Sequence, residues 1–271
     1  IGRDCANGST FNIAKSVFDA LGAKTYVVGN EPNGLNINLN CGSTHIDNLV
    51  NLVKEKELDC GFAFDGDADR CIAVDETGQV IDGDYIIYIC GTYLKKHGRL
   101  DGNHVVATIM ANLGLFKALE KNDIEYDVTT VGDKYVNEDM VAHGYVLGGE
   151  QSGHIIFSKH ATTGDGILTA IMIMEVIMEE KTSFHTLASG MKKYPQLLKN
   201  VKVDDKDAIL NNEKVQKCKD EIEAELKGNG RILLRASGTE PVIRVMAEAD
   251  TKELCAKYVD QMVDVIESVL N

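Results

Sequence analysis

The chain has 271 residues, and 44% of them are apolar, so it can bury a substantial core and its composition is not that of a disordered chain. Its 42 acidic residues outnumber its 28 lysines and arginines and give a formal net charge of −14, which argues against general nucleic-acid binding, because phosphate backbones are held by clustered basic side chains. The most apolar run, ILTAIMIMEVIM at 167–178, is too short to cross a bilayer and contains Glu175, so neither a membrane span nor a signal peptide is expected.

Seven cysteines are scattered along the chain, mostly in apolar surroundings and never as a CxxC pair. This usage is typical of reduced packing residues and predicts a cytoplasmic protein. The chain opens at Ile1, and IGRDCANGST reads as the end of a strand that leads directly into a helix start. Such an opening indicates a chain entered partway through a longer protein.

Strand and helix patterns alternate from the first residues onward. After a Ser-Thr N-cap, apolar residues at helical spacing predict a helix over 11–21. A strand at 24–29, a helix at 45–56 and a buried strand at 60–64 follow. This βαβ alternation predicts a parallel sheet, and ligands of such sheets bind beyond the carboxyl ends of the strands.

Later elements predict a second and a third unit. The second begins near GRLDGNHVVATIM, and its elements are a strand at 104–110, a helix at 113–121, a strand at 124–130, a helix at 133–142, a strand at 144–148 and a long apolar helix at 166–180. The charged, proline-containing stretch 192–208 indicates a boundary. Beyond it the chain reads as an extended stretch, a helix at 211–227, strands at 231–237 and 242–249, and a closing helix at 251–270. The expected domains are residues 1–98, 99–191 and 196–271.

Three aspartates alternate directly after a predicted buried strand, in the stretch DGDADR: Asp65, Asp67 and Asp69. Carboxylates this close together repel each other unless a cation neutralises them, and hard oxygen ligands of this kind suit Mg²⁺ or Ca²⁺. The small residues between them let the backbone curl and aim the side chains inward. No histidine or cysteine lies within the turn, which disfavours zinc. The stretch therefore predicts a metal site.

Two other interpretations of this stretch are open. Counted from Asp65, the acidic spacing reaches Glu76 in the register of an EF-hand, but Arg70 stands where that loop needs glycine, and the flanks read as strands. The stretch could also be a plain solvated acidic turn. Arg70 itself either forms an ion pair with the aspartates or steadies a phosphoryl group in transfer beside the metal.

The stretch RASGTEPVIR at 235–244 is a second candidate site. Its middle residues can turn backbone N–H groups and hydroxyls into one concave nest, and two arginines flank it with bidentate donors for a phosphate. The residues concerned are Arg235, Ser237, Gly238, Thr239 and Arg244. The alternative is a tight turn between two strands, with glycine at the bend and proline at the exit. No lysine follows the glycine, so this is not a nucleotide P-loop.

Three further polar stretches lie next to predicted elements. In GGEQSGH, Glu150, Ser152 and His154 offer an acceptor, a hydroxyl and an imidazole that suit sugar hydroxyls, although glycine turns of this kind are common. In VGDKYV, Asp133 and Lys134 follow a strand, and a plain helix start is the simpler interpretation. The stretch TTGDG is interpreted as the N-terminal cap of the apolar helix after it.

Taken in order, DGDADR, VGDKYV, GGEQSGH, TTGDG and RASGTEPVIRVMAEA resemble the α-D-phosphohexomutase superfamily, and the resemblance covers essentially all 271 residues. CANGST, GLNINLNCGSTH and GEQSGH are most similar to its amino-sugar branch. The resemblance implies an α/β fold class, with two successive α/β domains with mixed sheets and a smaller C-terminal α+β domain. It also implies an exchange of a phosphoryl group between the 1- and 6-positions of a sugar, through a bisphosphate. For this branch, glucosamine 6-phosphate becomes glucosamine 1-phosphate, en route to UDP-N-acetylglucosamine.

The same resemblance implies a role for each candidate residue. Asp65, Asp67 and Asp69 hold Mg²⁺, and Arg70, the catalytic residue on this chain, lies near the transferred phosphoryl group. Substrate binding is implied for the other candidates: Asp133, Lys134, Glu150, Ser152, His154, Arg235, Ser237, Gly238, Thr239 and Arg244. The implied ligand is a hexosamine phosphate, and no nucleic-acid or membrane partner is expected.

One motif of the superfamily is absent from the sequence. Its phosphoserine lies in a first domain, in a motif similar to TASHNP, and none occurs among these 271 residues. The expected partner is therefore the missing N-terminal domain of the same protein, and the 271-residue chain alone is expected not to turn over substrate. Two rival functions remain open: a sister mutase that acts on mannose or glucose phosphates, and a non-catalytic protein that binds Ca²⁺ or a sugar phosphate.

Overall fold

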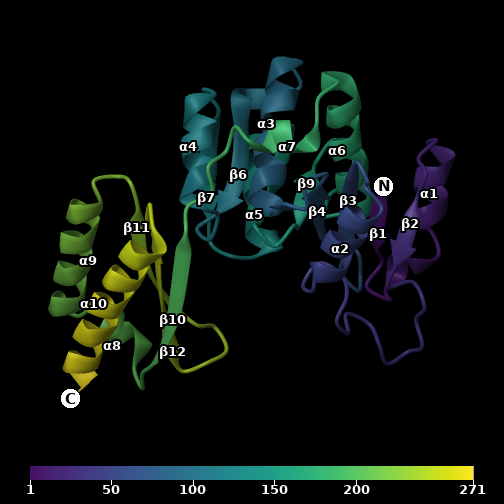
Figure 1. Ribbon diagram of the computed structural model, residues 1–271. Helices are drawn as coiled ribbons and strands as arrows, with labels where there is room; N and C mark the ends of the chain where they lie inside the picture. The colour runs from purple at the N-terminus through teal and green to yellow at the C-terminus, as the bar shows by residue number, and fades with distance from the viewer. Residues whose placement is uncertain (271) are drawn as a thin grey trace. The chain divides into compact units, whose positions relative to one another are not determined.

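The computed structural model describes residues 1–270, which form two compact units (Figure 1). The first comprises residues 1–111 and 115–192, and the second comprises residues 112–114 and the chain from Lys193 onward. The change of unit near Lys193 falls inside the predicted boundary stretch. None of the helices within residues 1–270 combines the length and the apolar character needed to cross a membrane.

The first sheet of unit one is mixed and has five strands in the order β2-β1-β3-β4-β5. Its strands are β1 (Gly2–Asp4), β2 (Tyr26–Val28), β3 (Cys60–Phe64), β4 (Cys71–Asp75) and β5 (Val80–Ile81). β1 pairs in parallel with both β2 and β3, whereas β3–β4 and β4–β5 are antiparallel. Since β3 and β4 are buried along their whole length, they fix both ends of the loop at residues 65–70.

Short helices follow from the apolar spacing in this part of the chain. They are a 3₁₀ turn (Ser9–Phe11), α1 (Ala14–Ala20) and α2 (Asp47–Glu55). In α2, Leu49 and Val53 are both fully buried and cluster with Val74 of β4. One face of α2 is therefore covered by the sheet, as its amphipathic pattern predicts.

The second sheet of unit one has four strands in the order β7-β6-β8-β9. Its strands are β6 (His104–Thr108), β7 (Glu125–Thr129), β8 (Leu147–Gly149) and β9 (Ile155–Phe157). β6 pairs in parallel with β7 and β8, and β9 runs antiparallel to β8. The helices of this part are α4 (Leu113–Lys121), α5 (Asp133–His143), α6 (Gly166–Glu180) and α7 (Phe184–Ala188), with a 3₁₀ turn at Asp101–Asn103. The strand predicted from residue 144 begins only at Leu147, because Gly144 ends α5 in a left-handed conformation.

The helix α3 (Gly83–Lys96) was not predicted from the sequence. Most of its residues are buried, since it packs against β8, β9, α6 and α7, so no polar stripe marks it as a helix. Its side chains share one apolar core with residues of both sheets, such as Phe62 of β3 and Leu147 of β8. The predicted division at residue 98 therefore falls inside one compact unit.

Unit two contains an antiparallel sheet in the order β10-β12-β11, and its helices pack against that sheet. The elements are β10 (Gln196–Lys202), α8 (Lys206–Leu210), α9 (Glu213–Leu226), β11 (Arg231–Ala236), β12 (Val242–Glu248) and α10 (Lys252–Leu270). The helices α9 and α10 lie side by side (Figure 1). Only the short α8 was missed in this unit. The predicted α/β class, with two mixed sheets and a smaller α+β part at the C-terminus, is confirmed.

All seven cysteines are buried and unbridged. Burial raises the pKa of the Cys60 and Cys90 thiols to about 12, so at neutral pH they are protonated packing groups.

Candidate functional site

The three aspartates lie in the loop that joins β3 to β4, whose ends are held together by the pairing of Phe64 with Cys71. Ala68 has a φ of 66°, so the loop folds back through a left-handed residue. The loop also packs closely against the backbone at Gly8, because a Cβ added to Gly8 would lie 2.4 Å from the carbonyl oxygen of Gly66. The loop is thus shaped by strand pairing and close backbone packing before any ligand is considered.

One carboxylate oxygen from each of Asp65, Asp67 and Asp69 can be chosen so that all three atoms lie within 4.8 Å of one another. Asp65 is only 4% exposed, whereas Asp67 is exposed to solvent. The Nε of Arg70 lies 3.1 Å from Asp65 Oδ2 and 3.7 Å from Asp69 Oδ1, and its backbone N–H donates to Asp65 Oδ1. Arg70 therefore offsets part of the negative charge of the loop.

The positive charge of Arg70 does not cancel the effect of burial on the pKa of Asp65. Burial raises the pKa of Asp65 to about 6, and the neighbouring Asp69 adds to the rise. Burial alone would raise the pKa of Asp69 as well, but its hydrogen bonds with Asp65 and His154 lower it overall. The two carboxylates are therefore held close together in a partly buried loop, where a bound cation would favour their charged forms.

Each alternative interpretation of the loop can be compared with its surroundings. The EF-hand interpretation is wrong, because strands β3 and β4 flank the loop where an EF-hand requires helices. A fully solvated acidic turn does not account for the burial of Asp65. The ion pair of Arg70 with the aspartates is present, and its contact with a phosphoryl group stays a prediction.

The stretch GGEQSGH connects two other regions of unit one. Glu150 Oε1 accepts a hydrogen bond from the backbone N–H of Gly132, the residue before α5, over 3.0 Å. His154 is buried, and its Nδ1 lies 3.0 Å from Asp69 Oδ2. Ser152, between them, is exposed. The structure therefore brings His154 to the aspartate loop. The resemblance implied a role for His154 in substrate binding and did not include this contact.

Asp133 and Lys134 occupy the first turn of α5, as the helix-start interpretation predicts. Both are exposed, and Lys134 lies 3.7 Å from Glu138 one turn later. Their stretch is next to GGEQSGH through the Gly132–Glu150 hydrogen bond. Contact of either side chain with a substrate stays a prediction.

The candidate phosphate loop of unit two lies between β11 and β12. Arg235 and Arg244 pair directly across these antiparallel strands, and within the described part of the chain the Nε of each is buried without a hydrogen-bond partner. Burial lowers the pKa of Arg235, and the facing charge of Arg244 lowers it further. Arg244 also pairs with Glu240, whose Oε2 lies 3.3 Å from its Nη2. Like charges that face each other across strands are destabilising, so the two arginines with one acidic partner suit a further anion.

The turn of this loop uses part of the predicted nest for its own structure. The Ser237 N–H donates to the carbonyl of Val242, and the Ser237 hydroxyl accepts from the N–H of Glu240. Gly238 and Thr239 are exposed at the tip. An anion would therefore meet the tip and the arginines, while Ser237 holds the turn in shape.

Two contributors to these loops were not identified from the sequence. Lys206 Nζ donates to the carbonyl of Ser237 over 2.7 Å and adds a cation to the phosphate loop. The backbone N–H of Gly164 donates to His154 Nε2 over 3.0 Å. Neither contact has a local sequence signal, because Gly164 lies ten residues from His154 and Lys206 lies 31 residues from Ser237.

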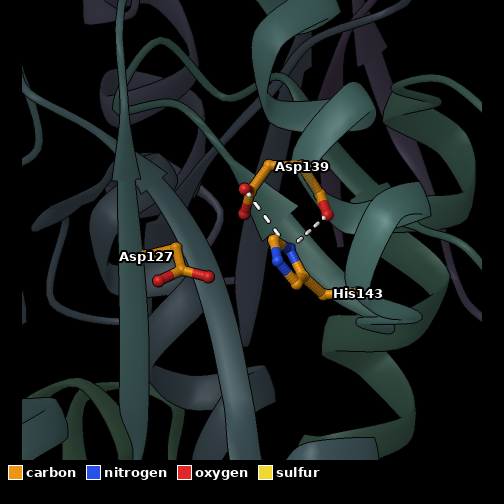
Figure 2. Close-up of side chains that lie close together, drawn as sticks. All are labelled: Asp127, Asp139 and His143. Atoms are coloured by element: carbon orange, nitrogen blue, oxygen red, sulfur yellow. Dashed lines mark hydrogen bonds and ion pairs between the residues drawn. The ribbon is translucent and has the colours of Figure 1, made fainter.

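A second group of possible metal ligands lies on β7 and α5. Figure 2 shows Asp139 and His143 side by side on α5, with Asp127 facing them from β7. Each carboxylate already has a histidine beside it: His143 Nδ1 lies 3.4 Å from Asp139 Oδ1, and His104 Nε2 lies 3.3 Å from Asp127 Oδ2. None of the three members of this group is buried, whereas Asp65 is, so the loop at 65–70 is the stronger candidate.

Family models cover almost the whole chain. The models of phosphoglucomutase/phosphomannomutase match alpha/beta/alpha domain II at residues 1–78, alpha/beta/alpha domain III at residues 82–194 and the C-terminal domain at residues 198–265. The domain III match begins at residue 82, so it includes α3, which the predicted domains had placed with the first sheet.

Curated relatives agree with this assignment. A phosphoglucosamine mutase of Lachnoclostridium phytofermentans is 58% identical over 266 residues, which are 98% of this chain and 59% of the relative. A phosphoglucosamine mutase of Bacillus subtilis is 53% identical over 268 residues, 99% of this chain and 60% of the relative. The chain thus spans about 60% of the length of the curated relatives that it matches.

Solved structures show the same fold. The N-acetylphosphoglucosamine mutase of Aspergillus fumigatus, in complex with GlcNAc-6P and magnesium, has a TM-score of 0.79 at 20% identity, over 98% of this chain and 65% of that one. A putative phosphomannomutase of Thermus thermophilus has a TM-score of 0.73 at 19% identity, over 98% of this chain and 60% of that one. With three successive domain models matched and relatives more than half identical, the chain belongs to the phosphoglucomutase/phosphomannomutase family.

Proposed function

We propose that this chain provides the metal-binding and phosphate-binding parts of a phosphoglucosamine mutase, which interconverts glucosamine 6-phosphate and glucosamine 1-phosphate through a phosphoserine and a 1,6-bisphosphate. The sugar is inferred from relatives of that name at 53–58% identity. The observation that carries the proposal is the pair of charge clusters, three carboxylates at 65–69 and two facing arginines at 235 and 244.

The aspartate loop fits Mg²⁺. Its donors are carboxylate oxygens, which Mg²⁺ prefers, and Asp69 Oδ1 is buried without a hydrogen-bond partner among the described residues. Asp65, Asp67 and Asp69 would hold the ion, whose chemistry when bound is to offset charge on the phosphoryl oxygens. Arg70 would contribute a second, fixed positive charge beside the transferred group.

The other candidate residues would bind and orient the sugar phosphate. Arg235 and Arg244 would grip the phosphate that is not transferred, and the facing charges favour that anion because it relieves their repulsion. Glu150 and Ser152 would accept and donate hydrogen bonds at sugar hydroxyls. Much of the catalysis of phosphoryl transfer is positioning, so these contacts would raise the rate as well as the affinity.

We further propose that these 271 residues bind the bisphosphate but do not turn substrate over alone. The sequence contains no stretch similar to TASHNP, so no phosphoserine of that type can form on it. An N-terminal domain of the same protein would supply that serine. Turnover of glucosamine 6-phosphate by the 271-residue chain alone would contradict this part of the proposal.

Calorimetric titration of the chain with glucosamine 1,6-bisphosphate, with and without Mg²⁺, tests the proposed ligand. Arg244→Ala should weaken binding about 10- to 150-fold, or ~1.5–3 kcal/mol, as expected for hydrogen bonds to a charged group. Lys199→Ala is the matched control, because Lys199 is a cation on β10 of the same sheet that also pairs with an acid, Asp260, but lies outside the loop between β11 and β12.

The same titration separates the rival functions. Tighter binding of mannose or glucose 1,6-bisphosphate would identify a sister mutase. Binding of Ca²⁺ with no affinity for any hexose bisphosphate would instead indicate a non-catalytic protein and would overturn the proposal.

A further inference from the structure

The aspartate loop is held by two segments that lie far along the chain. The backbone N–H of Cys71 donates to the carbonyl of Gly153, and the N–H of Gly166 donates to the carbonyl of Ala68. Gly164 is packed so closely that an added Cβ would lie 2.6 Å from the carbonyl oxygen of Asp69. The stretches GGEQSGH and TTGDG therefore form part of the wall of the aspartate loop.

His154 is the side chain that joins these segments. Its Nε2 accepts a hydrogen bond from the backbone N–H of Gly164, so that nitrogen carries no proton. Its proton therefore lies on Nδ1, which donates to Asp69 Oδ2 over 3.0 Å. Both ring nitrogens are engaged and the residue is 4% exposed, so the imidazole is fixed in one tautomer and one orientation.

The contact with His154 decides which carboxylate oxygen of Asp69 is available to bind a metal ion. Oδ2 is occupied by His154. Within the described residues, the buried Oδ1 has no hydrogen-bond partner, and Arg70 Nε lies 3.7 Å away. Without His154, Asp69 could rotate and exchange its two oxygens, or turn away from the repulsion of Asp65.

We propose that His154 is a positioning residue for the metal site: with Gly164 it holds Asp69 by Oδ2, so that Oδ1 points at the bound divalent cation. This inference rests on the proposed metal site at 65–69 and assigns His154 to the metal ligand, not to the sugar. Hydrogen-bond partners of metal ligands typically change metal affinity 10- to 100-fold when they are removed.

Mn²⁺ binding to the 271-residue chain, measured by electron paramagnetic resonance, tests the proposal without any turnover. His154→Ala should weaken the Mn²⁺ affinity about 10- to 100-fold. His154→Asn keeps an N–H donor near the position of Nδ1 and should restore the affinity to within a few-fold of wild type. His154→Gln places its amide near the position of Nε2 and should remain weak.

The chain offers a matched control at His185. Its Nδ1 lies 2.9 Å from Oδ2 of Asp75, a contact of the same kind with a fully buried aspartate outside the loop. His185→Ala should leave the Mn²⁺ affinity unchanged. Circular dichroism and melting curves establish that each variant is folded, and the comparison of asparagine with glutamine at 154 separates positioning from general loss of packing.

The outcomes separate this inference from the function on which it rests. Wild-type affinity in His154→Ala, or equal weakness of the asparagine and glutamine variants, would overturn the positioning role while the metal site stands. If wild type fails to bind Mn²⁺, both the proposed metal site and this inference are overturned.

Discussion

At the residue scale, the proposed function depends on like charges brought together. Asp65, Asp67 and Asp69 repel one another on one loop, and Arg235 and Arg244 do so across two strands. Both clusters could be predicted from the sequence, because both are local patterns. The aspartates alternate within one tight loop, and the arginines lie on either side of one turn. Their partners could not, since the contacts of His154 with Asp69 and of Lys206 with Ser237 arise only when segments far apart in the sequence pack together.

The burial of Asp65 should make the proposed metal binding and the stability of the metal-free fold depend on pH in opposite directions. Its pKa is raised to about 6 from 3.8, so its contribution stabilises the metal-free fold fully below pH 3.8 and is lost as the pH rises through about 6. Asp65→Asn should therefore raise the unfolding free energy of the metal-free chain at pH 7.5, by about 1–3 kcal/mol, and should abolish Mg²⁺ binding.

Urea denaturation with and without Mg²⁺ measures both effects. Glu138→Gln on the exposed face of α5 is a control that should change neither quantity. In wild type, Mg²⁺ affinity should fall as the pH drops below about 6. An Asp65→Asn chain that is less stable than wild type at pH 7.5 would contradict the burial argument.

At the element scale, the shape of the aspartate loop depends on strands and loops that pack closely against it. Most amphipathic helices were predictable, because one polar face gives each a regular pattern, and the buried strand β3 was predictable as a short continuous apolar run. The helix α3 was not, since nearly all of its residues are buried between other elements and no alternation remains. The predicted domain division at residue 98 follows this helix, whereas the match to the domain III model begins at residue 82, before it.

Gly153 shows how strictly the backbone near the site is packed. It has a φ of +94°, and an added Cβ would lie 2.3 Å from the carbonyl oxygen of Cys71, at the end of the aspartate loop. Gly153→Ala should lower the unfolding free energy by about 2–4 kcal/mol, since it adds a clash to the strain of a left-handed residue, and it should weaken Mn²⁺ binding.

Gly144→Ala provides the comparison for this change. Gly144 also has a positive φ, of +76°, but no atom lies within 4 Å of an added Cβ. It should cost only the backbone strain, about 1 kcal/mol, and leave Mn²⁺ affinity unchanged. Equal losses of stability in the two variants, measured by urea denaturation, would show that the close approach at Gly153 is unimportant.

At the scale of the whole molecule, the chain has two compact units, each with its own apolar core. The second unit begins near Lys193, at the start of the charged stretch 192–208, and that stretch also supplies Val201 and Val203 to the core of this unit. The pairing order of the strands could not be predicted, because it depends on contacts between segments far apart in the sequence.

Separate cores predict separate unfolding. Scanning calorimetry should show two transitions, and Val245→Ala, at a fully buried position of β12, should lower only one of them. The same substitution at Val106, fully buried in β6 of unit one, should lower only the other. Each should cost about 1–3 kcal/mol. One transition shifted by both variants would contradict independent unfolding.

The buried cysteines can be used to detect local opening of the structure. Five of them, at 5, 41, 60, 71 and 90, belong to unit one, and two, at 218 and 255, belong to unit two. A thiol that is enclosed and protonated reacts with an alkylating reagent only while its surroundings are open. Mass spectrometry of briefly labelled protein would therefore record, peptide by peptide, which of the two units opens first. The same measurement would show how far a bound metal or sugar phosphate slows that opening.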